Sequence, residues 1–235
     1  MALVAVGIVS AGTLWCIAWY QQDRPLLEVA AALNKGDASG AMKLINQFLR
    51  AYPDDSRAQS LKARILVDAG QYAEGLRLFH RFGAAETADL HAWAKAHLLR
   101  EEWSDALPVL ERLLQLNPND PDALHEITAC RSFLGQYREA IESAKRLSSQ
   151  PGNEARALLQ MGTLHKNLGN AHSAIEAWER VLEYDPQMEN LQIPAADFLR
   201  EFGRQLLQDG KAERARRFET QLGIEGIRKD FGKSG

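Results

Sequence analysis

Residues 158–186 read LLQMGTLHKNLGNAHSAIEAWERVLEYDP, and this stretch decides the fold because its apolar and small residues recur at helical spacing in two runs. The runs are separated by Leu-Gly-Asn at 168–170, where Gly169 can take the left-handed backbone conformation that ends a helix. The second run stops before Pro186, since a residue that precedes proline is biased away from the helical conformation. The stretch therefore predicts two helices joined by a tight turn.

The same pattern recurs along the chain with a period of 34 residues. Large, small and aliphatic positions keep their phase while the polar positions between them vary, which is what a repeated packing unit requires. A single two-helix unit cannot bury its apolar face, so neighbouring units must stack and share a core. The clearest series are Leu90, Leu124 and Leu158; Ala94, Thr128 and Gly162; Ala106, Ala140 and Ala174; and Leu113, Leu147 and Val181.

This pattern resembles the tetratricopeptide repeat, through Leu158, Met161, Gly162, His165, Gly169, Ala174, Trp178 and Pro186 in one unit. The resemblance implies an all-α fold, an α-solenoid of about six stacked helix-turn-helix units over residues 23–223. It also implies a right-handed superhelix whose concave groove is lined mainly by the first helix of each unit. The clearest units are 87–120, 121–154 and 155–188, the degenerate ones are 23–56, 57–86 and 196–223, and residues 224–235 form a tail.

Several residues carry local packing predictions. Gly162 should lie where the two helices of its unit approach closely, because it has no side chain. His97 and His165 occupy positions that an aromatic residue usually fills, so we expect them in the core. Cys130 is interpreted as a small buried hydrophobic residue. Pro108 is expected in the first turn of its helix, where a missing N–H costs little.

Residues 3–20 contain no charged side chain and predict one transmembrane helix within a 1–22 anchor. Eighteen residues at about 1.5 Å each span roughly 27 Å, close to the hydrocarbon thickness of a bilayer. Trp15, Trp19 and Tyr20 cluster at one end, where aromatic rings favour the headgroup region. A cleaved signal peptide and a buried core helix are the alternatives, and the absence of a basic start and of a polar face argues against them.

The anchor also predicts membrane topology and contacts. Lys and Arg occur only downstream of it, at Arg24, Lys35 and Lys43, which favours a cytoplasmic location for the repeats. We expect a single-pass protein of a bacterial inner membrane. Gly7 and Ala11 form a small-xxx-small pair that would let two anchor helices pack closely, the alternative being a plain lipid-facing helix.

Composition and motifs exclude several function classes. A net charge of −3 gives no electrostatic footprint for nucleic acid. Cys16 and Cys130 are too few and too far apart for a disulfide framework or a zinc site. The chain has no glycine-rich phosphate loop, no HExxH and no Gly-x-Ser-x-Gly motif. We therefore expect neither an enzyme nor a bound cofactor or metal.

The candidate partner-binding residues are those on the faces of the first helices that point away from the packing residues. Basic side chains outnumber acidic ones there, which predicts a mildly electropositive groove for an acidic or carboxylate-bearing segment, the alternative being a mixed surface without preference. Ser60 is expected on the same exposed face. The candidates are Arg64, His91, Lys95, His125, Arg156, Lys166, Asn167, Arg200 and Arg204.

Taken together, these features predict a membrane-anchored scaffold that binds a protein or peptide partner in its groove. Two alternatives are a permanent structural subunit of a membrane complex and a periplasmic binding protein left after cleavage of the first segment. A cofactor of chaperones is not expected. Family members of that kind hold a terminal carboxylate with lysine and asparagine residues on three successive units, but the leading lysine and both asparagines are missing here. The corresponding sites carry His91 and Lys95, then Glu126, then Arg156 and Gln160.

Overall fold

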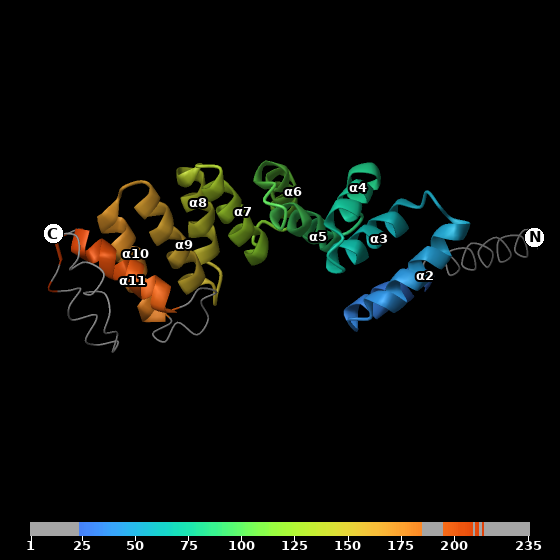
Figure 1. Cartoon of the computed structure of the whole chain (residues 1–235), viewed down its shortest axis with the longest axis horizontal. Helices are drawn as coiled ribbons and strands as arrows, with labels where there is room; N and C mark the ends of the chain where they lie inside the picture. Colours follow the sequence, from blue (N-terminus) through green and yellow to red (C-terminus); the bar gives the residue numbers. More distant parts are fainter. Residues whose placement is uncertain (1–23, 185–194, 209, 212, 214–235) are drawn as a thin grey trace, which may run out of the picture. The chain divides into compact units, whose positions relative to one another are not determined.

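The computed structural model describes residues 24–184, 195–208, 210, 211 and 213, without the side chains of 182, 195–200 and 208. Every regular element in these ranges is an α-helix (Figure 1). The predicted anchor, with Gly7 and Ala11, and the tail 224–235 lie outside the described residues. None of the helices that the structure describes is both long enough and apolar enough to cross a bilayer.

After a helical stretch over residues 24–34, the helices follow one another in pairs with short turns. Their bounds are α2 Ala38–Ala51, α3 Ser56–Asp68, α4 Tyr72–Phe82, α5 Thr87–Leu98, α6 Trp103–Leu116, α7 Pro121–Phe133, α8 Tyr137–Ser148, α9 Glu154–Asn167, α10 Ala171–Tyr184 and α11 Ala195–Gln208. The chain divides into two compact units, Met1–Val109 and Leu110–Gly235.

In the first unit α3 packs against the helix that follows it, α4, and it also contacts α2 and α5. Neighbouring hairpins are therefore in contact through α3. Val29, Ile45 and Phe79 are buried in the resulting cores. Asp55 begins α3 by accepting a hydrogen bond from the Ala58 amide at 2.9 Å, which satisfies one of the free N–H groups of the first turn.

In the second unit α7 packs against α8, α8 against α9, and α9 against α10. The first helices of two consecutive hairpins, α7 and α9, also contact each other directly. Trp178 of α10 meets Phe202 of α11 edge to face, with ring centroids 6.2 Å apart. Stacked helical hairpins that bury apolar residues between neighbouring helices are therefore present, as the 34-residue period predicts.

The turns explain part of the sequence pattern. Gly135 and Gly169 follow α7 and α9 with φ of 74° and 75°, a left-handed conformation that costs glycine little. Glu101 stands 34 residues before Gly135 and takes the same conformation, with φ of 59°. A side chain with a Cβ is strained there, so the α5–α6 turn departs from the pattern of its neighbours.

Of the local predictions, burial of His97 and of Cys130 is confirmed, with 3% and 0% of the residue exposed. His165 is only partly buried. The placement of Pro108 in a first turn is wrong. It lies inside α6, beyond the first turn that starts at Trp103, so the helix loses a backbone hydrogen bond there.

Candidate partner-binding surface

A cavity of about 450 Å³ lies between α7 and α9 in the second unit. Both are first helices of consecutive hairpins, the elements for which a partner groove was predicted. Phe133 at the end of α7 is 66% exposed although it is a large apolar residue. The residues that line the cavity are His125, Thr128, Ala129, Ser132, Phe133, Arg156, Leu159, Gln160, Thr163 and Leu164.

His125 is a partly buried polar residue of this cavity. Burial, with the charge of Arg156, lowers the pKa of His125 to about 4, so its ring is neutral at pH 7. The Gln160 side-chain amide donates a hydrogen bond to the His125 carbonyl at 3.2 Å, which ties α9 to α7. The Nδ1 atom of His125 and the Oε1 atom of Gln160 are buried without a hydrogen-bond partner. The cavity therefore contains unused polar atoms but no charge from histidine.

Arg156 is the candidate that lines this cavity and carries a positive charge. One of its terminal nitrogens lies 3.4 Å from a carboxylate oxygen of Asp122, whose side chain is 69% exposed. The Arg156 Nε atom is buried and donates no hydrogen bond. An exposed ion pair of this kind contributes little to stability, so Arg156 keeps capacity to bind another anion.

The other described basic candidates also pair with carboxylates of the chain itself. Because these ion pairs neutralise charge locally, the surface has less free positive charge than the sequence pattern predicted. The pairs are Arg64 with Asp89, Lys95 with Asp68 at 3.3 Å, Lys166 with Glu201 at 3.2 Å, and Arg204 with Glu201.

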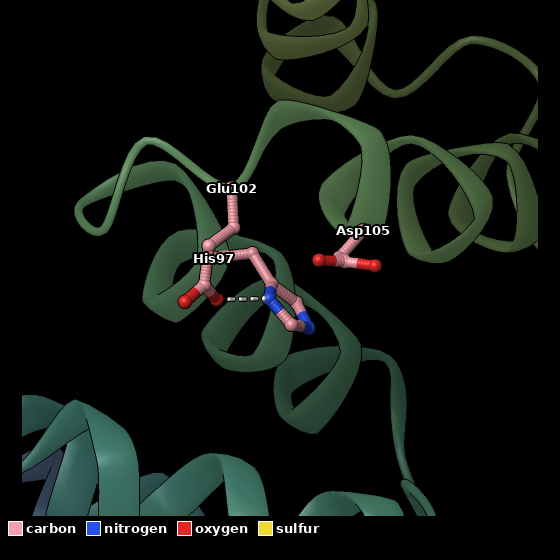
Figure 2. A group of neighbouring side chains, drawn as sticks. All are labelled: His97, Glu102 and Asp105. Carbon is pink, nitrogen blue, oxygen red and sulfur yellow. Dashed lines mark hydrogen bonds and ion pairs between the residues drawn. The ribbon is translucent and has the colours of Figure 1, made fainter.

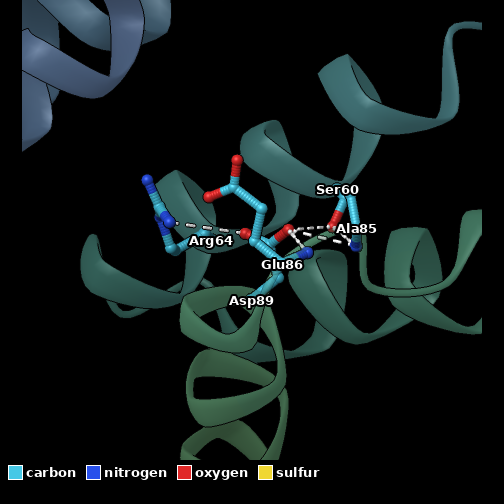
Figure 3. Close-up of polar contacts among 5 residues, drawn as sticks. All are labelled: Ser60, Arg64, Ala85, Glu86 and Asp89. Carbon is cyan, nitrogen blue, oxygen red and sulfur yellow. Dashed lines mark hydrogen bonds and ion pairs between the residues drawn. The ribbon is translucent and has the colours of Figure 1, made fainter. Parts of the chain in front are cut away.

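Ser60 and Arg64 are the clearest corrections to the predicted surface (Figure 3). Ser60 is fully buried, and its hydroxyl donates to the Asp89 carboxylate at 2.7 Å. The same carboxylate oxygen accepts from the backbone amides of Ala85 and Glu86, at 3.2 and 3.1 Å. Arg64 lies 3.5 Å from the other oxygen, and only 13% of its side chain is exposed. These residues fix the link between α4 and α5, so their predicted exposure in a groove was wrong.

The remaining candidates are distributed along the chain. His91 of α5 is partly buried and belongs to the first unit, and Asn167 at the end of α9 is exposed in the second. Arg200 lies in α11, but its side chain is outside the described residues. The structure therefore brings together His125 and Arg156 in one cavity and places the other candidates elsewhere.

Within the described ranges, His97, Glu102 and Asp105 form one group of potential metal ligands, with ligand atoms within 4.8 Å of one another (Figure 2). The Trp93 indole N–H donates to His97 Nε2 at 3.1 Å, so the ring proton is assigned to Nδ1. Nδ1 then donates to Glu102 at 2.8 Å. Both ring nitrogens are used, and a metal would have to displace one of these bonds.

This group is better described as a clamp on the α5–α6 turn. The Glu102 amide bonds to the His97 carbonyl at 2.9 Å, and Arg100 Nε donates to the Glu102 carboxylate at 2.7 Å. The hydrogen bond from His97 is the main cause that lowers the pKa of Glu102. Sequence reasoning placed His97 in an apolar core and missed its polar partners. The five-residue separation of His97 and Glu102 across a turn was the available signal.

Cys130 does not have the properties of a nucleophile. Burial, with a contribution from Glu126, raises the pKa of the Cys130 thiol to about 12. Because the thiolate is the reactive form, the raised pKa leaves little reactive thiolate at neutral pH.

Stacked two-helix units that leave a cavity between their first helices define the chain as a helical-repeat protein. Three family models described as tetratricopeptide repeat match residues 26–87, 97–162 and 155–188. The chain belongs to the tetratricopeptide-repeat family, as the sequence pattern predicted.

The chain is also similar in sequence or structure to several known proteins. MamA has 18% identity, a TM-score of 0.62, and coverage of 74% of this chain and 97% of that chain. YrrB, described as a TPR protein with an unusual peptide-binding site, has 19% identity, a TM-score of 0.65, and coverage of 74% and 92%. Tetratricopeptide repeat protein 37 of Xenopus laevis is 24% identical over 125 residues, 49% of this chain and only 8% of that relative's length.

Proposed function

We propose that this chain is a membrane-tethered scaffold that holds a protein or peptide partner on its tetratricopeptide repeats and has no catalytic activity. The observation that carries the proposal is the cavity between α7 and α9, with the exposed Phe133 ring on its wall. Large apolar side chains that remain exposed at a concave site favour contact with another molecule. The peptide-binding site in the description of YrrB supports the same type of ligand by analogy.

The tether rests on the composition of residues 3–20, which is apolar, free of charge and long enough to span a bilayer. Gly7 and Ala11 would allow close packing with a second anchor. The basic residues that follow the segment favour a cytoplasmic location of the repeats, with the anchor in a bacterial inner membrane.

Sodium carbonate extraction tests the tether: the full chain should stay in the membrane pellet, and a variant without residues 1–22 should be released. Release of the full chain would contradict it. A reporter fused after Gly235 tests the side of the membrane.

We propose a protein partner and not a nucleic acid, because the net charge is −3 and the described basic candidates pair with carboxylates. A photo-crosslinking residue at Thr163, exposed on the cavity wall, should capture the partner in intact membranes. The same residue at Arg138, exposed on α8 and outside the residues that line the cavity, is the matched control. Equal capture from both positions, or none from Thr163, would contradict partner binding at this site.

Two alternatives lead to different experimental outcomes. A permanent subunit of a membrane complex would remain in a large assembly after detergent extraction, whereas a transient scaffold would run as a single chain or a dimer. A periplasmic protein left after cleavage would have a mature amino terminus downstream of residue 20, which amino-terminal sequencing identifies.

A further inference from the structure

The α7–α9 cavity has the size and the walls for an apolar side chain. A dry cavity of about 150 Å³ accommodates benzene, and this cavity is about 450 Å³. The hydroxyls of Thr128 and Thr163 are already bonded to carbonyls of their own helices, at 2.7 and 3.1 Å. Those two hydroxyls have therefore used their donor hydrogens and can offer a ligand only an acceptor oxygen. Leu159, Leu164 and the exposed Phe133 supply apolar surface.

Among the residues that line the cavity, Arg156 is the one that carries a charge at pH 7. Arg156 has one ion pair, at 3.4 Å, with an Asp122 side chain that is mostly in solvent. Its Nε atom is buried and unused. Solvent screens the existing pair, so a carboxylate that comes from within the cavity can replace Asp122 and bond to two guanidinium nitrogens at once.

The other titratable residue on the cavity wall does not compete for an anion. His125 is neutral at pH 7 because burial and the neighbouring guanidinium oppose its protonation and lower its pKa to about 4. The cavity therefore combines one available cation with a mainly apolar wall. Its complement is an apolar side chain with one negative charge close by.

Resting on the proposed function, we infer that this cavity binds a linear segment of a partner protein, inserting one aliphatic or aromatic side chain between α7 and α9 while an adjacent carboxylate binds Arg156. The apolar group fills the space beside Phe133, and the carboxylate takes the place of Asp122. This inference makes the generally acidic partner predicted from the sequence more specific: one apolar anchor and one carboxylate are sufficient. The carboxylate comes either from an Asp or Glu side chain or from the terminus of the segment.

The first test is a selection of displayed random peptides on the full chain in detergent. Enriched peptides should share an aliphatic or aromatic residue next to an acid. A synthetic peptide with that acid changed to its amide should bind about tenfold more weakly or worse, since a hydrogen-bonded charge is lost. Peptides with a free or an amidated carboxyl terminus separate the two sources of the carboxylate. No enrichment above a surface without protein, or a consensus that lacks the apolar residue, would overturn the inference.

The second test changes the cavity. Ala129→Phe fills it and Thr163→Trp obstructs it from an exposed position, and each should reduce binding of the selected peptide at least about tenfold. Arg156→Gln should have a similar effect, whereas Arg138→Gln on α8, the matched control, should not. If Ala129→Phe unfolds the chain, Thr163→Trp still decides the question. Unchanged affinity in Thr163→Trp and Arg156→Gln would overturn the inference, and crosslinking of a cellular partner by other groove residues would then still support the proposed function.

Discussion

Gly162 of α9 lies directly against the indole ring of Trp178 of α10. A methyl group at position 162 would come within 2.7 Å of Trp178 Cε2 and closer still to Nε1 and Cδ1. The indole N–H is directed at the Leu159 carbonyl, 3.4 Å away, so the ring is positioned by α9 on two sides. This contact lets the two helices of the hairpin approach closely.

Gly162→Ala should therefore destabilise the protein by about 1–3 kcal/mol, because the ring must move out of a packed site. Urea unfolding followed by circular dichroism measures this difference. The cost should be smaller when Trp178 is first changed to Leu, since the clashing ring is then gone. Equal costs in both backgrounds would show that the alanine acts through some other contact.

Glu101→Gly should stabilise the protein by about 1 kcal/mol, because position 101 has the left-handed conformation that glycine occupies in the turns after α7 and α9. Glu101→Ala is the matched control: it removes the charge but keeps the Cβ, so it should gain little. The midpoint of urea unfolding measures both. A gain in Glu101→Ala as large as in Glu101→Gly would assign the effect to the charge.

Asp89→Asn should cost about 3 kcal/mol, because it removes the partner of the largely buried Arg64 and weakens the acceptor of three hydrogen bonds. Ser60→Ala removes one of those three bonds, together with the 3.2 Å bond that the Ser60 hydroxyl accepts from the Ala85 amide, and should cost about 1 kcal/mol because the Ala85 amide keeps its bond to Asp89. Adding Arg64→Met to Asp89→Asn should recover part of the loss. Unfolding curves of the three variants give these values, and a negligible effect of Asp89→Asn would contradict the structural role of the network.

Stability should fall as the pH is lowered from about 6.5 to about 4, in part because of His125. Its pKa is about 4 in the folded chain and near 6.5 in the unfolded chain, so in that interval the unfolded state binds the additional proton. At pH 5 the loss from this residue is about 1–2 kcal/mol relative to pH 7. The pKa of His165 is also lowered, mainly by burial, and adds in the same direction. His125→Gln should flatten, but not remove, the measured dependence; an unchanged slope would contradict the lowered pKa.

The Cys130 thiol should react slowly in the folded protein. A pKa of about 12, against 9.0 for a free thiol, leaves about a thousandfold less thiolate at a given pH. A Cys16→Ser background isolates this residue, and 5,5′-dithiobis(2-nitrobenzoate) reports its rate with and without urea. Fast labelling of the folded chain would show that Cys130 is accessible.

Much of the fold could be predicted because the residues that pack between helices recur every 34 positions in the sequence. Leu158, Gly162 and Ala174 each belong to such a series, and the structure buries all three between stacked helices. The candidate site was predicted less well. His125 and Arg156 meet in one cavity, but Ser60 is buried and Arg64 has a buried partner from a different helix. Helical periodicity identifies the face of a helix on which a residue lies. It does not identify which side chain of another helix will pair with that residue and neutralise its charge.

The sequence by itself determined the repeat, its helical hairpins, the glycine turns and the uncharged segment 3–20, because each depends on residues close together in the chain. Only the tertiary structure decided that Asp89 lies beside Ser60 and Arg64, that His97 clamps a turn with Glu102, and that α7 and α9 leave a cavity beside Phe133. Charge and burial at those places depend on contacts between different helices. Those contacts form only when the hairpins stack.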